Sequence, residues 1–309
     1  MRIGIGIGSL SGGPATLDDV IAQAQAAERD GFASCWLANI FDLDAILGAA
    51  LCARATERIE VGTAVVPTYP RHPVAMAQQA ISAAAAARGR FTLGIGLSHQ
   101  MVIDTMLGMS WDKPYTHCRE YLAVLRPLLH EGRVDFDGTQ YRVHAPLALP
   151  GATPPPILLA ALAPKMLALA GRQAEGTVTW MTGPQTIREH TAPRIREAAA
   201  AAGRPAPRIV VGLPVAVTRE VAAARESASR IFQIYGHLPS YRAMLDREGA
   251  GGPADVALVG DEAAVGEQLE RLVAAGATDF LAAPFPVDGD AGASARTRDF
   301  LAERVRAGR

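Results

Sequence analysis

The sequence predicts an α/β fold, a single (β/α)8 TIM barrel in which residues 1–309 form one domain. Short apolar runs alternate with longer helical patterns along the whole chain, as is typical of βα units and a parallel sheet. The apolar runs are continuous, as expected of strands that are buried on both faces. Eight strands with eight helices favour a closed barrel over an open doubly wound sheet, which rarely has so many regular units.

The strands are expected where the apolar runs lie. They are Ile3–Gly8, Phe32–Ala38, Ile59–Val66, Phe91–Leu97, Ile157–Ala161, Thr177–Met181, Ile209–Val217 and Thr278–Phe285. The first helix begins at Thr16, a residue type that caps helices, has Asp18 and Asp19 in its first turn and ends at Gly31. The other expected helices are Asp42–Thr56, His72–Ala87, Thr116–His130, Pro164–Gly171, Pro184–Ala202, Asp261–Ala275 and Ala293–Ala307.

Two segments interrupt this rhythm. Val134–His144 carries Asp137-Gly138 between two alternating runs, which predicts a β-hairpin insertion before the fifth strand. Arg219–Gly249 predicts a helical insertion after the seventh strand.

Composition excludes several functional classes. Hydrophobic residues make up 49% of the chain and charged residues 20%, and the net charge is −1, so neither nucleic acid nor a membrane surface is an expected partner. No run of about 18 uncharged apolar residues could span a bilayer. The cysteines, Cys35, Cys52 and Cys118, are odd in number and form no CxxC pair. Together with the absence of a visible signal peptide, they favour a reducing, cytoplasmic location.

The carboxyl ends of the strands are where a barrel enzyme carries its chemistry. No paired carboxylates, metal-ligand spacing, phosphate-binding loop of the GK[ST] type or GxSxG motif occurs there, so no metal is expected. The polar residues expected at this end are Asn39, Thr63, Thr68, Ser98, His99, Trp180 and Thr182. They stand among small and apolar groups, which suits a large, planar, mostly apolar ligand.

The segment Ala160–Leu167 opens a helix with small residues and a proline, so its free backbone N–H groups could hold a phosphate. An ordinary strand-to-helix turn would have the same pattern. The glycines of Gly4–Gly8 and Gly94–Gly96 are only a weak sign of a dinucleotide loop, because the spacing is wrong. The residues alone therefore indicate a cofactor-dependent barrel enzyme.

Several motifs in order resemble the luciferase-like monooxygenase superfamily. They are AVVPTYPRHPVAMAQQA from Ala64, AERDGFASCWLAN from Ala27, RFTLGIGLSH from Arg90, HCREYLAVLRPLL from His117 and PPPILLAALAPKMLALAGRQAEGTVTW from Pro154. The resemblance covers almost the whole chain. It is closest to the branch that uses the deazaflavin coenzyme F420, and it implies a barrel of the bacterial luciferase-like type.

The resemblance also implies where the cofactor lies. Ala64–Val65 would back the central flavin ring, and in the deazaflavin branch this peptide is often cis. The phosphate and side-chain arm would lie on Ala160, Ala161, Leu162, Ala163 and Pro164 and on Trp180, Met181 and Thr182. Gly96, Ser98 and His99 would border the same pocket.

One departure from the family bears on the reaction. Sugar- and alcohol-oxidising members that resemble this chain carry Asp-His at the end of the second strand, where this chain has Asn39-Ile40. Isoleucine cannot move a proton, so a reductase is expected. Asn39 would form hydrogen bonds beside the ring, and His99, Tyr115 or water would deliver the proton.

Three functions remain open from the sequence: a coenzyme F420-dependent oxidoreductase, an FMN-dependent monooxygenase, and a barrel that binds flavin without catalysis. The substrate is expected to be a small molecule, with Tyr235, His237 and Tyr241 of the helical insertion as candidates for its pocket. Small residues in the second and third helices favour close helix packing, and superfamily members commonly pair there, so a homodimer is expected.

Overall fold

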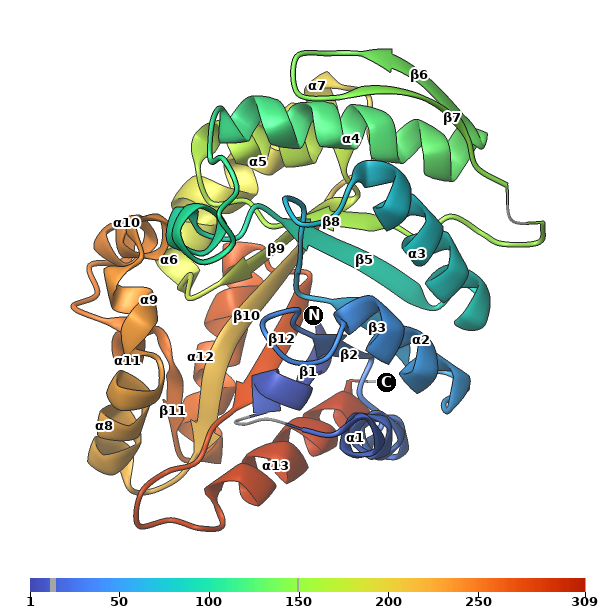
Figure 1. The fold of residues 1–309 in the computed structure, drawn as a ribbon. Helices are drawn as coiled ribbons and strands as arrows, with labels where there is room; N and C mark the ends of the chain where they lie inside the picture. The colour runs from blue at the N-terminus through green and yellow to red at the C-terminus, as the bar shows by residue number, and fades with distance from the viewer. Residues whose placement is uncertain (12–14, 149, 309) are drawn as a thin grey trace.

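Eight parallel strands close into a barrel in the computed structural model, which describes residues 1–11, 15–148 and 150–308 (Figure 1). In chain order they are β1 (Arg2–Ile7), β2 (Ser34–Leu37), β3 (Glu60–Thr63), β5 (Phe91–Gly96), β8 (Ile157–Leu159), β9 (Gly176–Trp180), β10 (Arg208–Val217) and β12 (Asp279–Pro284). The pairing of β12 with β1, where Asp279 lies opposite Arg2, closes the ring. The predicted (β/α)8 barrel is therefore confirmed.

Helices surround the strands in Figure 1. They include α1 (Leu17–Asp30), α2 (Ala45–Arg54), α3 (Pro73–Ala86), α4 (Pro114–Glu131), α5 (Pro164–Gln173), α6 (Pro184–Thr186), α7 (Ala192–Ala201), α12 (Glu262–Ala275) and α13 (Ala293–Ala307). The start and end of α1 are as predicted: Thr16 and Asp19 form a capping box, and Gly31 ends the helix with φ of 91°. Within the described ranges, no helix combines the length and the apolar character needed to cross a membrane.

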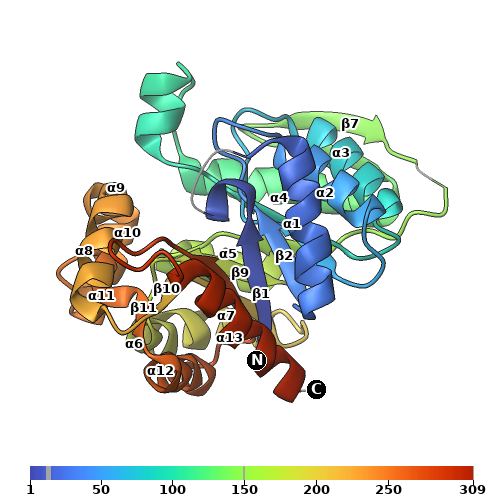
Figure 2. The same cartoon turned by 90° about the horizontal axis from the view of Figure 1, so that it is seen from below.

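Two further groups of elements lie outside the ring. The antiparallel hairpin of β6 (Arg133–Asp137) and β7 (Arg142–Pro146) precedes β8. Helices α8 (Val221–Ile231), α9 (Gln233–His237), α10 (Pro239–Glu248) and α11 (Pro253–Val256) follow β10. Figure 2 shows α8–α11 gathered on one side of the molecule, well separated from β7.

The structure corrects two expected elements and adds a third. The third strand was expected to be continuous over Ile59–Val66, but β3 ends at Thr63 and the chain pairs again only as β4 (Val66–Pro67). The helix expected over Pro184–Ala202 contains a π-helical turn at Ile187–Thr191. The strand β11 (Leu258–Gly260), which pairs with the end of β10, was not predicted because three residues are too few for a periodic pattern.

Trp36 of β2 fills the inside of the barrel. Its side chain is fully buried and packs with Leu158, Val178, Val210 and Leu281, one each from β8, β9, β10 and β12. Side chains from these five strands thus form one buried layer inside the barrel.

Glycines on the strands beside β2 leave room for this indole. A Cβ atom on Gly62 of β3 would lie 2.4 Å from a ring carbon of Trp36, and one on Gly4 of β1 would lie 2.8 Å from its Nε1. The indole Nε1 donates a hydrogen bond of 2.9 Å to Ser34 Oγ, so the buried N–H group is satisfied. The neighbouring strands β1 and β3 can therefore approach the indole of β2 closely.

Candidate functional site

The carboxyl ends of the strands bring the predicted site residues to one end of the barrel, because all barrel strands run parallel. Asn39 follows β2, Ala64 and Val65 separate β3 from β4, and His99 follows β5. The segments Ala160–Pro164 and Trp180–Thr182 lie at the ends of β8 and β9.

Four small or apolar residues, Ala64, Val65, Gly96 and Ala160, form what we call the floor of the site. Ala64, Val65 and Ala160 are partly exposed and pack on the Trp36 layer. A Cβ atom on Gly96 would lie 2.8 Å from Val65 Cγ2 and 3.1 Å from Ala160 Cβ, so these three residues touch. The peptide bond between Ala64 and Val65 is cis, as expected.

Asn39 is fixed by hydrogen bonds of its side-chain oxygen. Its Oδ1 accepts one from the backbone N–H of Ala45 (3.1 Å) and one from the Arg71 guanidinium (3.2 Å). Arg71 also pairs with Asp44, whose side chain caps α2. The oxygen of Asn39 thus joins the β2–α2 loop to the segment after β4, and the structure describes no protein partner for its Nδ2.

Two predicted site residues have a strained backbone. Ser98 and Met181 have φ of 65° and 52°, in the left-handed region that residues with a Cβ atom rarely adopt. Arg88 and Lys113 share this conformation at the ends of helices. Such conformations persist where the surroundings enforce them, and they gather at ligand sites.

His99 is half-buried and lies beside an aromatic side chain of α10. Its ring centroid is 5.4 Å from that of Tyr241. Burial lowers the pKa of His99 below its usual value, because the charged form loses its water. The imidazole is therefore mostly neutral at pH 7.

The start of α5 has the features of an anion site that the sequence suggested. The N-cap residue Ala163 offers no side-chain oxygen and Pro164 occupies the first helical position, so backbone N–H groups of the first turn lack a side-chain cap. Leu162 O, just before the helix, lies 2.7 Å from His190 Nε2. No local sequence pattern indicates this role of His190, because the contact depends on the π-helical turn of a different βα unit.

Trp180 connects the strand ends to the helices after β10. Its ring lies 5.8 Å from that of Tyr235 on α9 and 6.0 Å from that of Phe232. Tyr235 thus contacts Trp180 and Tyr241 contacts His99, whereas His237 is exposed and has no ring contact among the described residues. Phe232 was not predicted, since an apolar residue within a helical pattern carries no sign of its neighbours.

Three predicted polar residues are engaged elsewhere. The hydroxyl of Thr63 donates to Gly94 O (2.8 Å), and that of Thr68 lies 2.9 Å from His117 Nε2. Tyr115 OH accepts a hydrogen bond from Arg172 of α5 (3.3 Å). Burial lowers the pKa of His117 to about 4, so this imidazole is neutral and acts as a structural hydrogen-bonding group.

A model of the luciferase-like monooxygenase family matches residues 2–279. This range contains the first seven barrel strands and ends at the first residue of β12. The chain belongs to the luciferase-like monooxygenase family. The resemblance predicted from the sequence is thereby confirmed.

Relatives of this luciferase-like chain include reductases and dehydrogenases. It is 29% identical to 5,10-methylenetetrahydromethanopterin reductase from Methanolobus tindarius over 268 residues, which cover 86% of this chain and 81% of the relative. It is 31% identical to the F420-dependent glucose-6-phosphate dehydrogenase of Kineococcus radiotolerans over 206 residues, 62% of this chain and 60% of that enzyme. The structure of the coenzyme F420 dependent tetrahydromethanopterin reductase from Methanopyrus kandleri has the same fold, with a TM-score of 0.80, 19% identity and 99% of each chain covered.

In this luciferase-like barrel, Glu248 at the end of α10 ties the outer helices to the site. Its carboxylate accepts hydrogen bonds from the backbone N–H groups of Gln185 (3.0 Å) and Thr186 (2.7 Å) at the start of α6. A Cβ atom on Gly183 would lie 2.4 Å from Glu248 Cδ, so the glycine leaves room for the carboxylate. Helix α6 begins two residues after Thr182. The cap that Glu248 forms on α6 therefore fixes α10 relative to the end of β9.

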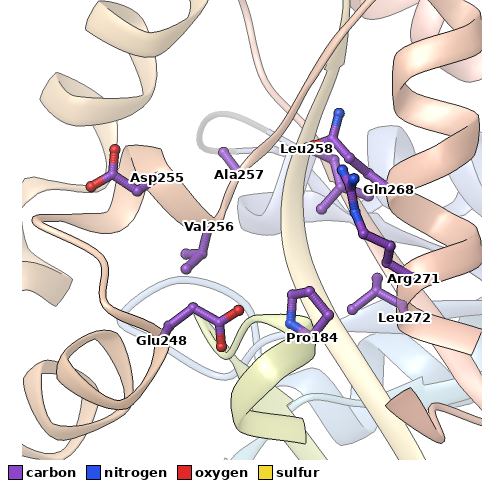
Figure 3. Close-up of a pocket in the computed structure, with 9 residues that line it drawn as sticks. All are labelled: Pro184, Glu248, Asp255, Val256, Ala257, Leu258, Gln268, Arg271 and Leu272. Carbon is purple, nitrogen blue, oxygen red and sulfur yellow. The ribbon is translucent and has the colours of Figure 1, made fainter. Parts of the chain in front are cut away.

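Figure 3 shows Glu248 beside Pro184 at the edge of a cavity of about 140 Å3. The cavity is also lined by Asp255, Val256, Ala257, Leu258, Gln268, Arg271 and Leu272. Small-molecule sites are usually about 300–1,000 Å3, so this cavity is too small for a planar cofactor.

We expect Glu248→Ala to loosen α10 and the start of α6 together. Removing a cap of this kind costs about 0.5–2 kcal/mol, and amide hydrogen exchange should rise in Gly183–Ile187 and in α10. Glu262→Ala is the control, because Glu262 is an exposed residue at the start of α12. Unchanged exchange in both segments of Glu248→Ala would show that the carboxylate does not hold them.

Proposed function

We propose that this chain is an oxidoreductase that uses coenzyme F420 for hydride transfer and reduces a small organic substrate. The observation that carries the proposal is the open floor at the strand ends, where Gly96 lacks a Cβ atom and Val65 and Ala160 are partly exposed. The reductase from Methanolobus tindarius and the F420-dependent dehydrogenase from Kineococcus radiotolerans support the choice of cofactor.

The residues present fit a large flat cofactor with a phosphate-bearing arm. The floor has no charged side chain, and Trp180 Nε1 is buried without a hydrogen-bond partner among the described residues. The uncapped first turn of α5 offers backbone N–H groups to a phosphate. A buried donor with no partner costs free energy, so a ligand that accepts from it is stabilised.

Coenzyme F420 in its reduced form, when bound, would supply a hydride. In this proposal Ala64 and Val65 back the ring, and Gly96 and Ser98 border it. Ala160, Ala161, Leu162, Ala163 and Pro164 hold the phosphate and side-chain arm, together with Trp180, Met181 and Thr182. The chain itself orients the reactants and excludes water from the floor.

Asn39 and His99 have different roles in the proposed reaction. The Nδ2 group of Asn39 donates a hydrogen bond beside the ring, while its Oδ1 stays on Ala45 and Arg71. A ring nitrogen of His99 carries the proton to the substrate. Ile40, next to Asn39, has no proton to exchange, which favours reduction over histidine-dependent oxidation of an alcohol.

We further propose that the chain works as one domain within a cytoplasmic homodimer. Most small residues of α2 are buried within the subunit, but Leu47 of this helix is 58% exposed, and Ile40 and Phe41, which precede the helix, are exposed as well. Apolar side chains of this size are usually covered in an assembly when they cluster.

Binding of each cofactor tests the proposed function. We expect coenzyme F420 to quench the tryptophan fluorescence and to bind at least about tenfold more tightly than FMN, a difference of about 1.4 kcal/mol. Reduced FMN with the protein should consume no oxygen beyond the free cofactor. Tighter FMN binding with protein-dependent oxygen uptake would make the chain a monooxygenase, and binding without turnover of any acceptor would make it a non-catalytic barrel.

The pH profile separates the roles of His99 and Asn39. Protonated His99 is present below its pKa, so kcat should fall as pH rises through that pKa, and burial places the fall below about 6.5. His99→Gln should flatten the profile. Asn39→Ala should keep the inflection and weaken cofactor binding by about 1–3 kcal/mol. Loss of the inflection in Asn39→Ala, with its retention in His99→Gln, would reverse these assignments.

A further inference from the structure

Six ring side chains run in one continuous series across the end of the barrel. We call Phe285, Phe232, Trp180, Tyr235, Tyr241 and His99 the aromatic arc. Successive ring centroids are 5.7, 6.0, 5.8, 5.2 and 5.4 Å apart. These separations are those of edge-to-face and tilted aromatic pairs, in which each ring fixes the next.

The arc joins three strand ends through the helices that follow β10. Phe285 follows β12 directly, Trp180 ends β9 and His99 follows β5. Tyr235 and Tyr241 come from α9 and α10. Phe285 is 1% exposed, whereas the other five rings are partly exposed, so the series leads from the buried barrel wall to an accessible surface. The arc ends at His99, three residues after Gly96 of the floor.

No member of the arc carries a charge at neutral pH, because burial keeps His99 mostly neutral. The polar residues predicted at the same strand ends, Asn39, Ser98 and Thr182, are also uncharged. The carboxylate of Glu248 is already satisfied by two backbone N–H groups of α6. An anionic group held against these rings would lose its water without gaining a cation.

The arc nevertheless offers aromatic contacts. Tyr235, Tyr241 and His99 are partly exposed, so a second ring can pack against their edges and faces. Flat rings beside the arc would gain edge-to-face contacts that a saturated ring cannot make.

We propose that the aromatic arc is the wall of the substrate site and selects an uncharged, flat, unsaturated ring. The inference rests on the proposed function, because it takes the substrate to meet the cofactor at the strand ends. It goes beyond that function by naming the chemical class of the substrate.

Three related probes test this selection. They are 2-naphthol, naphthalene-2-sulfonate, which adds a negative charge, and decahydro-2-naphthol, which is neutral but not flat. Isothermal titration calorimetry with the coenzyme F420-loaded protein should show 2-naphthol binding at least about tenfold more tightly than either of the others. Equal or tighter binding of the sulfonate or of the saturated alcohol would overturn the proposal.

Variants test whether the arc is responsible. Tyr241→Leu should weaken 2-naphthol binding about threefold to tenfold, and Tyr241→Phe, which keeps the ring, should retain it. Tyr235→Leu gives the same test if Tyr241→Leu does not fold. Phe300→Leu is the control, since this ring lies on α13 against Arg304 and is not part of the arc. Unchanged 2-naphthol binding in a folded leucine variant of the arc would contradict the inference.

The two proposals can fail separately. If coenzyme F420 does not bind, the proposed function fails, and the same probe series on the protein without cofactor still decides whether the arc selects flat neutral rings. If the cofactor binds and the three probes do not differ, the arc proposal fails and the proposed function stands.

Discussion

The close packing of β1 and β3 against Trp36 of β2 is the constraint on which the site depends. The indole fills the barrel, and the strands beside it can close only because Gly4 and Gly62 have no side chain there. Ala64, Val65 and Ala160 of the floor pack on the same buried layer. The floor is therefore held by the packing of the core and does not rely on flexible loops. A rigid surface of this kind suits a flat ligand, because the protein loses little conformational entropy when the ligand binds.

The other side of the site depends on contacts between distant parts of the chain. Glu248 caps α6, and the aromatic arc joins α9 and α10 to three strand ends. Both contacts act on the segment that carries Trp180, so the outer helices and the strand end should move together. The site thus combines a floor fixed by the core with a wall fixed by capping and by ring contacts, and substrate variation can arise in the wall without disturbing the floor.

The sequence was sufficient for the barrel, because continuous apolar runs and helical patterns are local signals repeated along the chain. The cis peptide at Ala64–Val65 came only from family resemblance, since nothing in two small apolar residues indicates it. The Glu248 cap joins residues 62 and 63 positions apart, and the His190 contact with Leu162 spans 28 positions. Such pairs depend on how whole elements pack, so local patterns could not predict them. The engagement of Asn39 Oδ1 by Arg71 was missed for the same reason.

A crystal structure of the protein with coenzyme F420 tests the central claim most directly. The account predicts the ring against Ala64–Val65 and the phosphate-bearing arm at the first turn of α5. Cofactor density at any other place, such as the groove lined by Glu28, Arg58 and Arg306, with the floor left uncovered, would contradict it.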